Sequence, residues 1–350
     1  KKSHCILHQI QILCWPSPGS GRKIMCSFST KERPSGLGSL FNILIIALFN
    51  NFCFLSPFVL PISCLILCIR IPLCTVPAAL YLIYCLKDGS EHENGKPWGW
   101  FTENFFLFKI MRNYFPISMH LDDKLQPGFM TGEEQLIFAI HPHGTCSDYR
   151  IFMDGMLHKT FPKLRSWRTL AAGVLFKLPL VRELALWTHC VDASRPVAMK
   201  QLDNGHSIFV VPGGEHEQLL TENGKEILYL RKRKGFVRLA IISGASLVPV
   251  YVFGASDLYH TSNVLFGLRF WLMKTLQICI PIFWGRFGML CPLNKPLDMV
   301  FGEPISVERN PKPSKEEISK VHEIYIKKLE ELFEERKKDF GYGDRKLQIL

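Results

Sequence analysis

A hydrophobic block at residues 41–86 constrains this chain more than any other feature. Arg70 is its only fully charged residue. A membrane-spanning helix needs about 20 apolar residues, so the block is long enough for two passes through a bilayer. The prolines at 57, 61, 72 and 77 divide it, which favours a transmembrane or re-entrant hairpin over one long helix. A hairpin buried in a soluble core is the alternative, and the apolar length disfavours it.

The flanks of this block predict how the rest of the chain is organised. The positions before it include the cations Arg22, Lys23, Lys31 and Arg33, which favour a cytosolic N-terminal side. A complete hairpin returns the remaining chain to that same side. We therefore divide the chain into a poorly structured segment (1–40), a membrane hairpin (41–86), a linker and interfacial segment (87–113) and a folded domain (114–350).

Net charge indicates the kind of partner, and cysteine spacing indicates whether the chain holds zinc or disulfides. The formal net charge of +11 favours anionic partners, such as nucleic acid, phospholipid headgroups or a phosphorylated cosubstrate. The 12 cysteines contain no CxxC pair, and most lie in apolar surroundings before residue 80. We expect reduced thiols that pack as small hydrophobic groups, without a zinc site or disulfide framework.

Strand-like and helix-like segments alternate after the linker. The apolar patterns predict strands at 135–140, 207–211, 246–253 and 299–301, and helices at 149–158, 178–186, 236–242 and 314–340. Ser314 and Glu317 have the spacing of a capping box at the start of the last helix. This alternation predicts an α/β domain with a central, mostly buried sheet.

Two histidines directly after the first predicted strand form the strongest catalytic candidate. The motif runs from Ile140 through His141, Pro142 and His143 to Gly144, and Asp148 follows four residues later. A neutral imidazole near pH 7 can remove a proton from a hydroxyl group, and a nearby carboxylate can orient its ring. We therefore predict His143 as the base, Asp148 as its orienting partner, His141 as a supporting residue and Gly144 as a point of close substrate approach. No third and fourth ligands stand at zinc spacing, so we predict no metal.

A glycine pair and an acidic residue follow the second predicted strand. Pro212, Gly213 and Gly214 leave backbone N–H groups free to stabilise an oxyanion or a phosphate, and Glu217 can bind a polar acceptor or tune a histidine. A simple turn with solvated acids is the alternative.

Four consecutive cations, Arg231, Lys232, Arg233 and Lys234, precede the helix predicted at 236–242. Such a run can bind the phosphates of a cosubstrate such as coenzyme A. Nucleic-acid binding is a competing interpretation, but no recognised fold signature accompanies the run, and we predict no nucleic-acid partner. A solvated charge run is the third interpretation.

Together these motifs resemble the type 2 diacylglycerol acyltransferase family, which includes monoacylglycerol and wax-ester acyltransferases. The resemblance covers residues 114 to 350 and rests on the following ordered segments: Tyr114-Phe-Pro, the His-Pro-His-Gly at 141–144, Pro-Gly-Gly at 212–214 with Glu217, Arg-Lys-Gly-Phe at 233–236, Leu-Val-Pro-Val-Tyr at 247–251, Phe-Gly at 253–254 and Gly-Glu-Pro-Ile at 302–305. The hairpin upstream is also where this family carries its membrane anchor.

The resemblance implies a glycerolipid-acyltransferase-like domain that esterifies a lipid alcohol with acyl-CoA as cosubstrate and no other cofactor. It implies diacylglycerol as acceptor, with monoacylglycerol or a wax alcohol as alternatives, and residence in the endoplasmic reticulum membrane or at the lipid droplet. A catalytically silent membrane scaffold, and an oligomer, stay open.

Two positions depart from the family pattern. Asp148 completes a His-x4-Asp spacing that many type 2 members lack, which strengthens the assignment of His143. Ala255 and Ser256 stand where many members have Glu-Asn, which puts a role for those positions in doubt.

Overall fold

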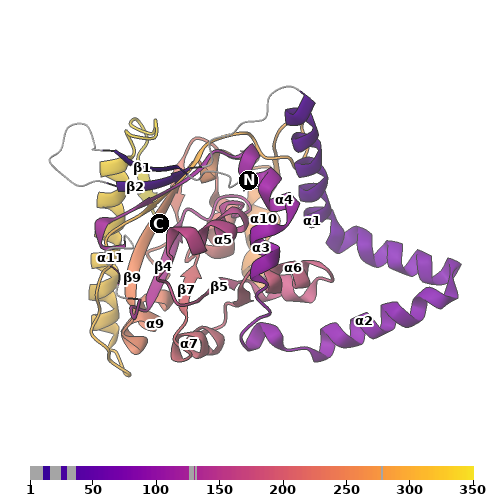
Figure 1. The fold of residues 1–350 in the computed structure, drawn as a ribbon, viewed down its shortest axis with the longest axis horizontal. Coiled ribbons are helices and arrows are strands. Elements are labelled where there is room, and N and C mark those ends of the chain that lie inside the picture. Colours follow the sequence, from indigo (N-terminus) through magenta and orange to yellow (C-terminus); the bar gives the residue numbers. More distant parts are fainter. Residues whose placement is uncertain (1–10, 16–24, 30–36, 126–129, 131, 277–278) are drawn as a thin grey trace, which may run out of the picture.

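A mixed sheet forms the centre of the folded domain (Figure 1). The structure is a computed structural model that describes residues 11–15, 25–29, 37–125, 130, 132–276 and 279–350. The strand order is β1-β2-β3-β12-β9-β4-β7-β5-β6. The strands are β1 (Gln11–Trp15), β2 (Met25–Ser29), β3 (Ile117–Leu121), β12 (Leu297–Phe301), β9 (Ser246–Phe253), β4 (Leu136–His141), β7 (Ser207–Val210), β5 (Trp167–Ala171) and β6 (Cys190–Asp192). The five strands from β9 to β6 are mutually parallel, so the predicted α/β domain with a buried central sheet is confirmed.

Helices cover both faces of this sheet (Figure 1). On one face lie α1 (Leu37–Arg70), α3 (Gly99–Asn104), α4 (Phe106–Tyr114) and α5 (Tyr149–Thr160). On the other lie α7 (Arg195–Asp203), α9 (Gly235–Ser243) and α11 (Lys315–Arg336). Strand β4 contributes to both cores because its side chains alternate: Phe138 and Ile140 enter the first core, and Ile137 and Ala139 the second.

The remaining helices and strands lie outside these layers. They are α2 (Thr75–Lys87), α6 (Val181–Trp187), α8 (Gly214–Leu220), α10 (Phe266–Leu276), the strand pair β10 (His260–Thr261) and β11 (Phe283–Trp284), and the strand pair β8 (Glu226–Leu228) and β13 (Leu347–Ile349). The eight predicted elements appear as β4, β7, β9, β12, α5, α6, α9 and α11.

The last helix differs from its prediction at both ends. The backbone N–H of Glu317 donates to Ser314 Oγ at 3.0 Å, but the Glu317 carboxylate accepts from Asn310, so only half of the capping box forms. The helix ends at Arg336, before the predicted 340, and Phe340 packs on Phe253 with ring centroids 5.0 Å apart. The half-buried Phe340 ring packs against the core beyond the end of the helix.

The hydrophobic block forms α1 and α2, which project away from the domain and return to it (Figure 1). The first half of α1 packs on the domain, where Ile46 and Asn50 are buried. Beyond it the apolar side chains face outward, and Ile69 and Leu73 are 69% and 81% exposed. Among the described residues, no helix has both the length and the apolar character that crossing a membrane requires.

The other predicted segments are placed as follows. Most of 1–40, with the four cations that precede the hydrophobic block, lies outside the described residues. In 87–113, Phe108 and Met111 are buried in the domain core, while Trp100 and Phe106 are exposed. The cysteines with described side chains are free thiols.

A buried cation anchors the end of the hairpin to the domain. The Arg182 side chain of α6 is 1% exposed, and its guanidinium donates to Asp88 at 2.5 Å, Glu91 at 3.0 Å and Glu183 at 3.2 Å. Burial alone would raise the pKa of Asp88, but hydrogen bonds from Lys96, Ser90 and Arg182 hold it well below its usual value. The chain leaving α2 is therefore fixed by charge-assisted hydrogen bonds.

Arg182→Ala should lower the free energy of unfolding by about 3 kcal/mol, because it removes a buried cation from three half-buried carboxylates. Thermal or denaturant unfolding of the detergent-solubilised protein measures this. Lys124→Ala is the control, since Lys124 pairs with Glu303 at an exposed site, where such pairs contribute about 1 kcal/mol or less. Equal effects of the two variants would contradict this assignment.

Candidate active site

His143 lies in the loop after β4 with its side chain half-buried. Its Nδ1 is 2.9 Å from the carbonyl oxygen of Gly144 and 3.3 Å from Ser147 Oγ. A carbonyl can only accept, and the Ser147 hydroxyl donates to the His143 carbonyl at 3.0 Å. This pattern assigns the imidazole proton to Nδ1 and leaves the lone pair on Nε2.

The environment of His143 keeps its ring neutral. Burial is the main effect that lowers its pKa below 6.5, and the positive charge of Arg150 adds to it. The hydrogen bond to Gly144 acts in the opposite direction without cancelling burial. At pH 7 the imidazole is therefore able to accept a proton at Nε2.

Asp148 does not orient His143 in this structure, which corrects the predicted pairing. Its Oδ1 accepts a hydrogen bond from the Tyr259 hydroxyl at 2.9 Å, and no hydrogen bond joins the described side chains of Asp148 and His143. The cause is local: Ser147 takes a left-handed conformation (φ 52°) just before α5 and itself lies against Nδ1. Burial raises the pKa of Asp148 to about 6.

Glu217 is the residue that holds the histidine loop in place. Its side chain is fully buried on α8. Oε1 accepts the backbone N–H of His143 at 2.5 Å, and Oε2 accepts the backbone N–H of Tyr229 at 2.8 Å. Burial raises the pKa of Glu217 to about 7, although these two hydrogen bonds and the charge of Arg233 lower it. One carboxylate thus joins two segments far apart in the sequence.

Glycines next to this carboxylate are required by space and by backbone conformation. A Cβ at Gly213 would lie 2.2 Å from Glu217 Oε2, and Gly214 has φ 55°. On the other side, Gly144 has φ 65° and a Cβ there would lie 2.9 Å from the carbonyl oxygen of Ala255. The segments predicted at 141–144 and 212–217 therefore meet, with Pro212 leading into the turn.

His141 takes a different position from His143, and its supporting catalytic role stays a prediction. It is the last residue of β4, is fully buried, and its Nε2 lies 3.0 Å from the Tyr325 hydroxyl of α11. Burial, with a smaller effect of His322, lowers its pKa to about 3. Its side chain follows the alternation of β4 toward the core under α11.

The four predicted cations do not form one cluster. Arg233 donates to His216 Nδ1 at 2.8 Å and lies over the Tyr229 ring, close to Gly213. Lys234 donates to Ser319 of α11, while Arg231 and Lys232 are exposed and Arg231 Nε donates to the carbonyl of Ile349. Only Arg233 therefore belongs to the cluster around Glu217.

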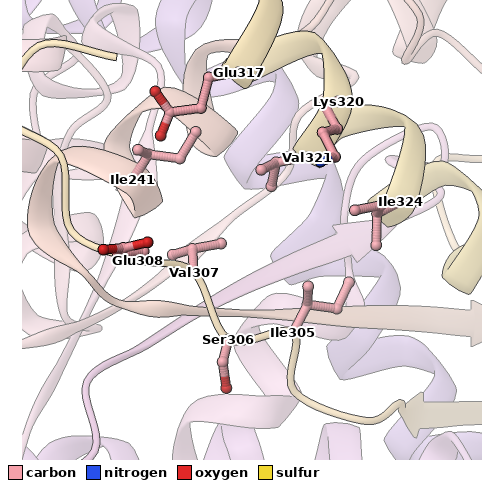
Figure 2. A pocket seen from close by; sticks show the side chains of 9 residues that line it. All are labelled: Ile241, Ile305, Ser306, Val307, Glu308, Glu317, Lys320, Val321 and Ile324. Carbon is pink, nitrogen blue, oxygen red and sulfur yellow. The ribbon is translucent and has the colours of Figure 1, made fainter.

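Other parts of the domain do not add to this cluster. A cavity of about 230 Å³ lies between α11 and the segment after β12, and none of the predicted site residues lines it. Figure 2 shows Val321 and Ile324 opposite Ile305 and Val307 across this cavity. In the described ranges, no group of three or more His, Cys, Asp or Glu side chains is placed to hold a metal ion.

Sequence reasoning missed Ser147, Tyr229, Tyr259 and Asn50. Ser147 lies within the histidine motif and could have been found there. The Tyr259 hydroxyl accepts from Asn50 Nδ2 of α1 at 3.3 Å and donates to Asp148, but these residues are too far apart in the chain for any local pattern to connect them.

Gly213→Ala should destabilise the protein by about 1–3 kcal/mol, since the added methyl group must displace the Glu217 carboxylate. Gly235→Ala at the start of α9 is the control, because nothing lies within 4 Å of a Cβ there. Thermal unfolding of both variants tests this. Equal stability of the two proteins would contradict the tight contact.

The sequence profile of the family described as "Diacylglycerol acyltransferase" matches residues 66–349 of this chain. Among similar proteins, "Diacylglycerol O-acyltransferase 2-like protein 6" of Mus musculus is 31% identical over 78% of this chain and 86% of its own length. "2-acylglycerol O-acyltransferase 3" of Homo sapiens is 31% identical over 75% of this chain and 81% of its own. "Diacylglycerol O-acyltransferase 2" of Dictyostelium discoideum is 32% identical, covering 80% of this chain and 88% of that protein.

Among solved structures, the 1-acyl-sn-glycerophosphate (LPA) acyltransferase PlsC from Thermotoga maritima aligns with a TM-score of 0.40 and 16% identity, over 84% of this chain and 97% of that one. The family match and the relatives confirm the resemblance drawn from the sequence motifs. The chain therefore belongs to the diacylglycerol acyltransferase family, the acyltransferases of glycerolipid synthesis.

Proposed function

We propose that this protein transfers the acyl group of acyl-CoA to the free hydroxyl of diacylglycerol, with His143 as the general base. The observation that carries this proposal is the hydrogen bond between His143 Nδ1 and the Gly144 carbonyl, which leaves Nε2 as the proton acceptor. The neutral ring, with its pKa lowered by burial, supports the same role.

The reaction needs no acyl-enzyme. His143 Nε2 takes the hydroxyl proton of the acceptor while its oxygen attacks the thioester carbonyl carbon. The tetrahedral intermediate then collapses with cleavage of the C–S bond, and the imidazolium returns the proton to the sulfur of coenzyme A. Backbone N–H groups near Gly144 or Gly213–Gly214 hold the oxyanion in this proposal, supported by the close approach of these two turns through Glu217.

Arg233 is the cation that we assign to the coenzyme A phosphates. It is the member of the basic run that lies beside Gly213 and His216. Arg231 and Lys232, just before Arg233, are exposed, and there they can attract an anionic cosubstrate before it binds.

Diacylglycerol is the acceptor we favour because the family description names it. Relatives of equal identity are named as 2-acylglycerol acyltransferases, so monoacylglycerol is the second candidate. A panel of diacylglycerol, monoacylglycerol and long-chain alcohols, assayed in a host without triacylglycerol, separates these acceptors. Complementation of such a host also separates the enzyme from a silent membrane scaffold.

We place the protein in the endoplasmic reticulum membrane or at the lipid droplet, with α1 and α2 as its anchor. The exposed apolar side chains along both helices support this placement. The predicted cytosolic side of the domain is where acyl-CoA would reach it.

His143→Ala should lower triacylglycerol synthesis about 100-fold or more, since a positioned base contributes about that much. Asp148→Asn should lower it far less, because Asp148 binds Tyr259 rather than His143. Microsomes supplied with labelled oleoyl-CoA and diacylglycerol give both rates. Wild-type activity in His143→Ala would exclude His143 as the base. Equal losses of activity in the two variants would indicate that Asp148 does orient His143.

The rate should also fall in acid as His143 becomes protonated. Because burial lowers its pKa, we expect the acid limb of the kcat/KM profile to have its midpoint below 6.5. The same profile in Glu217→Gln separates the titration of Glu217, whose pKa is about 7. A midpoint above 6.5 in both proteins would contradict the environment described for His143.

A further inference from the structure

Residues 258–297 form a long segment without a single acidic residue. The neighbouring Asp257 and Asp298 bound it, and it contains the cations Arg269, Lys274, Arg286 and Lys295. It carries α10 and the β10–β11 strand pair. Nothing in the reaction proposed above uses its outer face.

Helix α10 has its polarity inverted relative to a helix that faces water. Its buried side carries Arg269, which is 5% exposed and donates to the carbonyl oxygens of Val264, Ser262 and Ile280 at 2.9, 2.6 and 3.3 Å. A helix facing water normally keeps its charges outside and its apolar groups inside. Here the charge is inside and satisfied by backbone carbonyls.

The outward side of this segment is apolar. Leu265, Leu268 and Trp271 are 65%, 52% and 55% exposed, and Phe287 beyond β11 is 66% exposed. Exposed Lys274 lies on the same helix, and Arg286 lies over the Phe287 ring with its guanidinium carbon 5.1 Å from the centroid. Tryptophan and phenylalanine interleaved with cations are typical of surfaces that enter the headgroup region of a bilayer.

The length of α10 restricts how it can meet a bilayer. Its 11 residues span about 16 Å at 1.5 Å per residue, about half the thickness of the hydrocarbon core. It can therefore lie in the interface but cannot cross it. Attraction of Lys274 and Arg286 to anionic headgroups, with no acidic residue within the segment itself, adds to the apolar contribution.

We propose that the outward face of α10 and the β11 turn, formed by Leu265, Leu268, Trp271 and Phe287, is a second membrane-contact surface, separate from α1 and α2. Two contacts within the chain place this surface beside α1 and beside α8, the helix that carries Glu217. Asn50 of α1 donates to Tyr259, directly before β10. Phe270 of α10 contacts His216 of α8 with ring centroids 6.5 Å apart.

This position has a consequence for substrate access. A bilayer seated on this face brings the acyl chains of a lipid acceptor to the side of α8, the helix that carries Glu217. That consequence depends on the proposed function, whereas lipid contact by the surface itself does not.

Photocrosslinking of the full-length protein in vesicles tests the surface. Separate variants carry p-benzoylphenylalanine in place of Leu265, Phe287 or, as control, Ile324, which is 43% exposed on α11. The vesicles contain phosphatidylcholine, phosphatidylserine and a trace of radiolabelled phosphatidylcholine. We expect label on the protein after irradiation at 265 and 287, severalfold above that at 324.

Labelling at 265 and 287 no higher than at 324 would overturn the proposal. So would crosslinks at these positions to a second copy of the chain, which would assign the face to a dimer. We expect the same crosslinking to lipid when His143→Ala is added to each variant. Lipid contact is therefore tested independently of the catalytic proposal.

Discussion

The buried carboxylate of Glu217 is the interaction on which the rest of the site depends. It accepts backbone N–H groups from His143 and Tyr229, and thereby joins the loop after β4 to the segment after β8. The position needs two acceptor oxygens, because both of its partners donate. Gly213 provides the space for the carboxylate, and the charge of Arg233 offsets part of the cost of burying it.

The two histidines of the motif are separated by the geometry of the strand that precedes them. His141 still belongs to β4, so the alternation of side chains directs it into the core under α11, where it meets Tyr325. His143 lies beyond the strand and is held by loop contacts. The same short motif therefore places one imidazole in the core and the other in a loop beyond the strand.

Several parts of the fold and site could be predicted from the sequence because their signals are local. The continuous apolar run of β9 gave its bounds as Ser246–Phe253, and the glycine-rich turn at 212–214 indicated a site beside the histidines. Asp148 has the spacing of a partner for His143, but Tyr259, more than 100 residues away, competes for it. The run at 231–234 looks uniform in sequence, yet the side chains of Arg231, Arg233 and Lys234 bind three different neighbours. The sequence of α10 does not show that Arg269 is its buried side chain, so its apolar outward face could not be predicted.

The kcat of purified Glu217→Gln, measured with acyl-CoA and a lipid acceptor, tests the central role of this carboxylate most directly. The glutamine keeps the size of the side chain but turns an NH2 group toward one of the two backbone donors. We expect a kcat at least about tenfold lower in a protein that still unfolds cooperatively, because the His143 loop loses its position. A kcat equal to that of the wild type would contradict it.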